Sequence, residues 1–143
     1  MSTTASAPVR APIALPTPAS LRAAAQSAWA RGEPLVVMTT LAGCPYCDLV
    51  RQHHLLPMVK AGEVVAVQVD VRDRRTLLQG FQGESASPAE LVASWKAKFA
   101  PTVLFFGARG EELAERLEGV AVPDFYGEYL AARLEQARLK LRK

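Results

Sequence analysis

Long apolar runs are missing from this chain of 143 residues, and it holds only two cysteines. Its longest apolar stretches, such as Leu35 to Met38 and Thr102 to Phe106, fall far short of the roughly 18 residues that a membrane-spanning helix needs. A transmembrane protein is therefore excluded. Two cysteines exclude a disulfide-dense mini-protein, and an apolar content of 50% excludes a disordered chain or a collagen. The length suits one globular domain with tails.

Acidic residues are scarce only at the end of the chain. The net charge is +3, and the excess comes from the last turns, where a single carboxylate, Glu135, stands among Arg133, Arg138, Lys140, Arg142 and Lys143. A basic helix end is typical of a solvated terminus that matches the helix dipole. No aromatic or glycine-rich RNA-binding signature accompanies it. No nucleic-acid partner is therefore expected.

The first residues show no periodic apolar pattern. Residues 1–19 are rich in Ala, Pro, Ser and Thr, which predicts a flexible leader before a domain over residues 20–143. The basic start and the continuous apolar region of a secretory signal are both missing. Two interpretations stay open: a cytoplasmic protein, or an exported one whose signal has been removed.

The rest of the chain predicts helices alternating with strands. A helix begins after the N-cap Ser20 and ends near Gly32. Apolar, β-branched runs at 35–40, 64–71 and 102–106 predict buried strands of a mixed or parallel sheet. A helix is expected from Pro45 until Pro57 interrupts or kinks it.

The second half carries a clear helix start and a less regular segment before it. Residues 72–86 are charged and hold two glycines, so we expect a surface insertion there. Ser87 to Glu90 form a capping box with proline at the first helical position. In that helix Leu91, Trp95 and Phe99 recur every four residues, which predicts an apolar stripe in the core. Residues 113–119 fit the spacing of either a helix or a strand, and the turn before them favours a strand. A terminal helix after Pro123 completes the order.

The sequence Cys44-Pro45-Tyr46-Cys47 lies between a predicted strand and a predicted helix. A free cysteine thiol has a pKa of about 8.5, and a helix N-terminus lowers that pKa, so Cys44 is the expected nucleophile. Cys47, one turn further into the helix, is the expected resolving thiol. Gly43 and Pro45 set the shape of the loop and of the first helical turn, and Tyr46 is expected at the substrate-facing rim.

The two cysteines also have interpretations other than redox chemistry. A structural disulfide closing so short a loop removes little entropy from the unfolded chain, so stabilisation is a poor reason for it. His53 lies roughly 9 Å along a straight helix from Cys47, which is too far for one metal ion to bind both. Metal binding between two copies of the chain and cysteines placed by chance remain as alternatives. His53 and His54 are expected on the helix surface or partly packed, with a role in proton transfer as the alternative.

The strand, the CPYC motif and its helix, the second strand, and the run Lys98-Phe-Ala-Pro101-Thr102 before the third strand resemble the thioredoxin superfamily, from Ser20 to the C-terminus. The resemblance implies an α/β thioredoxin-like fold, in which a central mixed four-stranded sheet is flanked by helices and an insertion comes before the helix that precedes a cis-proline. It also implies a cis Ala100–Pro101 bond and substrate binding by Ala100, Pro101 and Thr102.

Within the superfamily, the chain is most similar to the periplasmic thioredoxin-like proteins associated with sulfur oxidation, the SoxW-like group. That similarity implies the periplasm, with the cytoplasm as the alternative. Two positions depart from ordinary thioredoxin: Met38 replaces a buried aspartate, and Asp48 replaces a lysine, where its charge should oppose thiolate formation. CPYC is also the glutaredoxin motif, but residues 117–120 offer no equivalent clamp for a glutathione carboxylate.

The leading hypothesis is a thiol:disulfide oxidoreductase that reduces protein disulfides with Cys44 and Cys47. The cysteine pair is itself the redox group, so no bound metal, nucleotide or haem is expected. The expected partners of this monomer are protein disulfides and a thiol-donating reductase, which is a membrane thiol carrier in a periplasm or a flavin reductase in a cytoplasm. The alternatives are a disulfide oxidant or isomerase, and a non-enzymatic binding module with the cysteines as a redox latch.

Overall fold

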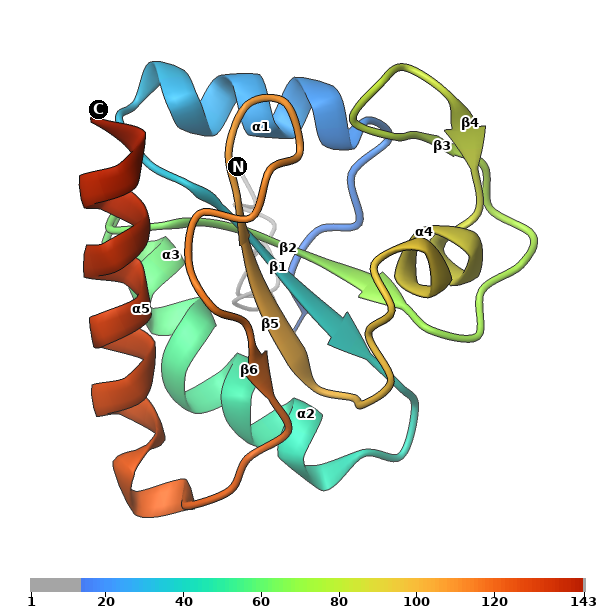
Figure 1. Ribbon diagram of the computed structural model, residues 1–143. Coiled ribbons are helices and arrows are strands. Elements are labelled where there is room, and N and C mark those ends of the chain that lie inside the picture. Colours follow the sequence, from blue (N-terminus) through green and yellow to red (C-terminus); the bar gives the residue numbers. More distant parts are fainter. Residues whose placement is uncertain (1–13, 143) are drawn as a thin grey trace, which may run out of the picture.

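A computed structural model describes residues 14–142 (Figure 1). Its centre is a four-stranded sheet in the order β2-β1-β5-β6. β1 and β2 pair in parallel, whereas β5 is antiparallel to both β1 and β6. The strands are β1 (Leu35–Thr40), β2 (Val65–Asp70), β5 (Thr102–Phe106) and β6 (Leu117–Glu118). The predicted α/β class with a mixed four-stranded sheet is confirmed.

Helices cover both faces of this sheet (Figure 1). The helical segments are α1 (Leu21–Ala30), α2 (Pro45–Val50), η1 (Arg51–Leu55), α3 (Leu56–Lys60), α4 (Pro88–Ser94), η2 (Pro123–Phe125) and α5 (Tyr126–Leu141). The helices α2, α3 and α5 pack against one face, and α1 and α4 pack against the other. No described helix is long and apolar enough to cross a membrane.

The residues of β1 alternate between two hydrophobic cores. Val36 and Met38 join the core beneath α2, α3 and α5, whereas Leu35 and Val37 join the core beneath α1 and α4. All six residues of β1 are buried. A central strand covered on both faces needs apolar side chains on both sides, which explains the continuous apolar run in the sequence.

The helix after the cysteine motif does not end at Pro57. It passes through the π-helical turn η1, in which the amide of Leu56 donates to the carbonyl of Arg51, and continues as α3. Pro57 stands in the first turn of α3, where a missing amide hydrogen is tolerated. The sequence expectation of an interruption is therefore met by a change of helical geometry.

Residues 72–86 are more than a surface insertion. Two short strands, β3 (Leu78–Gln79) and β4 (Ser85–Ala86), pair antiparallel within it. Leu78 and Phe81 are buried, and the Phe81 ring lies 4.7 Å from the Phe106 ring between their centroids. Most of the segment is exposed, as expected of a surface insertion, but two large side chains anchor it to the core.

The capping box at the start of α4 is confirmed, with the Ser87 and Glu90 side chains each accepting the other residue's amide. The predicted apolar stripe is correct only in part. Trp95 packs on Phe106 with ring centroids 5.1 Å apart, but Phe99 is 55% exposed. The helix ends at Ser94, and Lys96 takes a positive φ of 55°, so helical spacing no longer applies at Phe99.

The start of the described chain differs from the expected flexible leader. Leu15 is only 3% exposed and belongs to the core beneath α2 and α3. The carbonyl of Pro16 accepts the amide of Gln68 at 3.0 Å, which pairs residues 14–16 with the outer edge of β2. Residues 1–13, the larger part of the expected leader, lie outside the described residues.

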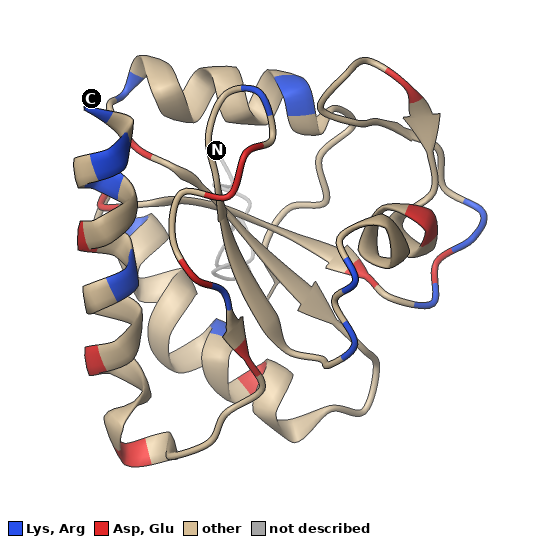
Figure 2. Ribbon diagram, viewed as in Figure 1, with Lys and Arg blue, Asp and Glu red and all other residues tan. Residues whose placement is uncertain are grey.

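Among the described residues, the basic side chains at the end of the chain run from Arg133 in the middle of α5 to its C-cap Arg142 (Figure 2). One of them has a structural role, because Arg138 binds the carboxylate of Glu33 at 2.9 Å and the carbonyl of Glu63 at 3.0 Å.

The predicted strand over 113–119 is reduced to the two residues of β6, with Leu113 donating its amide to Phe105 further along β5.

Candidate redox site

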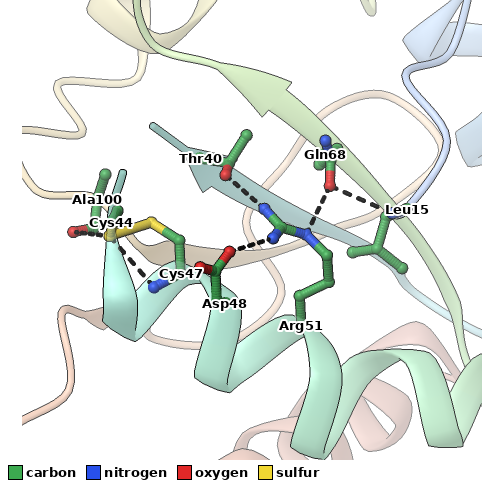
Figure 3. A network of polar contacts seen from close by, with 8 residues as sticks. All are labelled: Leu15, Thr40, Cys44, Cys47, Asp48, Arg51, Gln68 and Ala100. Atoms are coloured by element: carbon green, nitrogen blue, oxygen red, sulfur yellow. Dashed lines mark hydrogen bonds and ion pairs between the residues drawn. A yellow bond between two sulfur atoms is a disulfide. The ribbon is translucent and has the colours of Figure 1, made fainter. Parts of the chain in front are cut away.

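The cysteine motif lies where β1 passes into α2 (Figure 3). Gly43 takes a φ of +75°, a conformation that favours glycine, and turns the chain into the helix. Cys44 is the N-cap residue of α2, and its sulfur accepts the amide of Cys47 at 3.2 Å. Pro45 follows in the first turn. The two cysteines form a disulfide with Cα atoms 5.2 Å apart.

The two sulfur-bearing residues differ in exposure. Cys44 is partly exposed, whereas Cys47 is completely buried. Tyr46, between them, is 49% exposed. An incoming thiol or disulfide can therefore reach Cys44, while Cys47 is accessible only to Cys44. This asymmetry matches the chemistry of a nucleophilic and a resolving thiol.

The segment before β5 faces the disulfide. The Ala100–Pro101 peptide bond is cis, and the Cys44 sulfur lies 3.7 Å from the carbonyl oxygen of Ala100. In the reduced state the Cys44 thiol can donate to that oxygen. On its other side, the carbonyl of Pro101 accepts the amide of Gly119 at 2.7 Å, which ties the segment to the loop after β6.

Of the three predicted substrate-binding residues, only Ala100 is partly exposed. Pro101 and Thr102 are buried. The Thr102 amide donates to the hydroxyl of Thr39 at 2.8 Å, and the Thr102 hydroxyl donates to the carbonyl of Phe99. The amide and the hydroxyl of Thr102 thus both donate hydrogen bonds within the protein. Phe99, which the sequence pattern assigned to the core, is instead the large exposed side chain beside this segment.

Sequence reasoning missed Arg51, which is only 8% exposed. Its guanidinium donates to Asp48 at 2.9 Å, to the Thr40 hydroxyl at 2.6 Å and to Gln68 at 3.0 Å (Figure 3). The amide of Leu15 donates to the same Gln68 oxygen at 3.2 Å. The spacing of Asp48 and Arg51, three residues apart on a helix, was the available signal.

Met38, at the position where ordinary thioredoxins have a buried aspartate, is fully buried among apolar side chains. The two histidines lie further along the helix, and the His54 ring packs on Tyr126 with centroids 5.2 Å apart. Burial, with a smaller contribution from His53, lowers the pKa of His54. Among residues 14–142 no group of three or more His, Cys, Asp or Glu side chains is arranged to hold a metal ion.

Several thioredoxins of solved structure superpose on this chain. Thioredoxin O2 from Arabidopsis thaliana superposes with a TM-score of 0.55 at 20% identity, covering 87% of this chain and 94% of that one. Thioredoxin NaTrxh from Nicotiana alata superposes with a TM-score of 0.57 at 17% identity, covering 90% and 99%. A poplar thioredoxin h gives 0.52 at 17% identity, covering 75% and 82%. At these identities the likeness concerns the fold.

A comparison with functionally curated proteins found no match. The sequence model of one family, described as a thioredoxin-like domain, matches residues 21–136. The match includes the sheet, the Cys44–Cys47 disulfide and the cis-proline segment, which together support thiol–disulfide chemistry at this pair. Since the match spans most of its length, the chain belongs to the thioredoxin-like domain family.

Proposed function

We propose that the protein is a thiol:disulfide oxidoreductase that reduces disulfides in other proteins. The observation that carries the proposal is the asymmetry of the cysteine pair: a partly exposed Cys44 at a helix N-terminus and a fully buried Cys47. The free amides at the start of a helix favour the thiolate form of Cys44. Burial keeps Cys47 away from every sulfur except that of Cys44.

The reaction proceeds in two exchanges. The Cys44 thiolate attacks one sulfur of a substrate disulfide, forming a mixed disulfide and releasing the other substrate sulfur as a thiolate. Cys47, once deprotonated, then attacks the Cys44 sulfur and releases the second substrate sulfur. The substrate gains two electrons, and the protein is left with the Cys44–Cys47 disulfide. A thiol-donating reductase, such as a membrane thiol carrier, must then return the pair to the dithiol.

Exposed aromatic side chains beside the disulfide favour a polypeptide substrate. Tyr46 is 49% exposed and Phe99 is 55% exposed, one in the motif and the other just before the cis-proline segment. Aromatic rings offer a large contact area with little loss of side-chain entropy. The resemblance of the motif to SoxW-like proteins supports a place in the periplasm, which we include in the proposal.

Reduction of insulin disulfides by dithiothreitol, with and without the protein, tests the activity. We expect the wild-type protein to accelerate the reduction, and Cys44→Ser to abolish the acceleration. Reduced Cys47→Ser, separated from dithiothreitol and then mixed with insulin, should accumulate a mixed disulfide that is visible by mass spectrometry, since the resolving thiol is gone. A Cys44→Ser variant as active as wild type would contradict the proposal. Rapid oxidation of reduced proteins without reduction of insulin would instead identify an oxidant.

A further inference from the structure

A buried cation follows the redox motif on the same helical segment. The side chain of Arg51 is 9% exposed, and it comes one helical turn after Cys47. A guanidinium is always charged in proteins, so this site carries a positive charge whatever the redox state of the cysteines.

The guanidinium is held rigidly by groups from three parts of the fold. It donates to Asp48 on α2, to Thr40 at the end of β1 and to Gln68 on β2. Thr40 leads into the motif, and Asp48 follows Cys47 directly. Figure 3 shows this network and the disulfide along the same stretch of helix. The position of the positive charge relative to both cysteines is therefore fixed by hydrogen bonds on several sides.

The same network also holds the carboxylate of Asp48, whose charge is predicted from the sequence to oppose thiolate formation. The Asp48 carboxylate, whose side chain is 69% exposed, lies 2.9 Å from Arg51. A carboxylate near a thiolate raises the free energy of the reduced state, and a guanidinium lowers it. Because the two opposite charges are held together, their effects on the free energy of the reduced state largely cancel.

We propose that Arg51 is a positioning residue that sets the reduction potential of the Cys44–Cys47 couple by offsetting the charge of Asp48. The inference rests on the proposed function, because it assigns a regulator to the same cysteine pair. Without Arg51 the Asp48 charge is uncompensated, the thiolate is destabilised and the couple becomes more reducing. Without Asp48 the Arg51 charge is uncompensated and the couple becomes more oxidising.

The other charged side chains of this region stay constant in the test. Asp70, at the end of β2, lines the same hollow as Asp48 and Arg51 beside Gly43, and its carboxylate accepts the amide of Arg72. Lys98 precedes the cis-proline segment, and Glu118 on β6 pairs with Thr102. Their contributions cancel when variants at positions 48 and 51 are compared with wild type.

The experiment equilibrates each purified protein with reduced and oxidised glutathione. One protein disulfide and two glutathione thiols exchange with one protein dithiol and one glutathione disulfide, and alkylation followed by mass spectrometry measures the ratio. The proteins are wild type, Arg51→Gln, Arg51→Lys, Asp48→Asn and the double variant. Arg116→Gln is the matched control, since the Arg116 side chain, 18% exposed, also forms an ion pair with a more exposed carboxylate, that of Glu112 at 2.6 Å. The pH dependence of Cys44 alkylation is recorded in parallel.

We expect Arg51→Gln to lower the equilibrium constant for reduction by about threefold to tenfold, a change of about 15 to 30 mV. Asp48→Asn should raise it by a similar factor, and the pKa of Cys44 should move up in the first variant and down in the second. The double variant and Arg51→Lys, which keeps the charge, should remain within about twofold of wild type. Arg116→Gln should leave the constant unchanged.

Equal constants in wild type, Arg51→Gln and Asp48→Asn would overturn the inference, as would shifts of the same sign in both single variants. If Arg51→Gln fails to fold, Asp48→Asn still decides the matter, because it removes an exposed carboxylate and carries its own predicted sign. A wild-type protein that forms no Cys44–Cys47 disulfide in any buffer would overturn the proposed function and this inference together. A wild type that cycles normally with unshifted variants overturns the inference alone.

Discussion

The hydroxyl of Thr39 joins β1 to the backbone of Thr102, whose amide donates to it at 2.8 Å. The same hydroxyl donates to the carbonyl of Phe99 at 3.1 Å. The backbone pairing of β1 with β5 stops at Met38 and Val103. The fully buried Thr39 side chain therefore links the two strands at the next residue, through hydrogen bonds to the backbone. It fixes the segment that faces Cys44 relative to the strand that leads into the motif.

Replacing Thr39 by valine should therefore destabilise the fold. The Phe99 carbonyl keeps the Thr102 hydroxyl as a donor, but the buried Thr102 amide loses its acceptor, which costs about 1–3 kcal/mol. Thr39→Ser keeps the hydroxyl and serves as the control. Urea unfolding of both variants measures the difference, and equal stability of the two would contradict this assignment.

Leu15 should contribute to stability although it lies in a segment whose composition predicts a flexible leader. Its side chain is 3% exposed, so Leu15→Ala should lower the free energy of unfolding by about 2 kcal/mol or more. Leu77→Ala, at a position 68% exposed, should change it by less than about 0.5 kcal/mol. Thermal and urea unfolding report both values. A neutral Leu15→Ala would mean that the segment does not pack in solution.

The N-cap of α4 gives a third prediction. The Ser87 hydroxyl accepts the amide of Glu90 at 3.2 Å, and Ser87 is almost fully buried. Ser87→Ala should cost about 1 kcal/mol of stability. Ser27→Ala on the exposed side of α1 is the matched control and should be neutral or slightly stabilising, since alanine favours a helix interior. Loss of stability in the control alone would refute the capping argument.

His54 should make stability depend on pH. Burial, followed by the charge of His53, lowers its pKa below 6.5 in the folded state, so the unfolded chain binds the proton more readily. The free energy of unfolding should therefore fall as the pH decreases through 6.5 and level off below the folded-state pKa. His54→Gln should remove this dependence, whereas His53→Gln should keep most of it. Urea titrations across this range test the prediction, and an unchanged pH dependence in His54→Gln would contradict it.

Local patterns were enough to predict much of the fold. The largely apolar runs predicted β1, β2 and β5, because strands of a sheet that helices cover on both faces need apolar side chains on both sides. The residues from Ser87 to Glu90 predicted a helix start because a capping box satisfies backbone amides within one turn. In each case the pattern that predicts the element lies within a few consecutive residues of the sequence.

Other features depended on partners far away in the chain. Leu15 and Phe81 lie in segments without periodicity, and they are buried because distant strands and helices provide the apolar surface. Phe99 fitted a helical stripe, yet the chain leaves the helix after Ser94, and its side chain stays exposed. Neither outcome follows from spacing alone.

For the redox site, the sequence by itself determined the pair of cysteines and the family that the motif resembles, and it predicted the order in which they act, because a four-residue motif at a helix start is a local arrangement. Only the tertiary structure decided the surroundings of that pair. It brought Ala100 to the Cys44 sulfur from 56 residues away, and it placed Arg51 between Asp48, Thr40 and Gln68. Charges and hydrogen bonds act through space, so the environment that tunes a thiol is set by which strands and helices the fold places beside it.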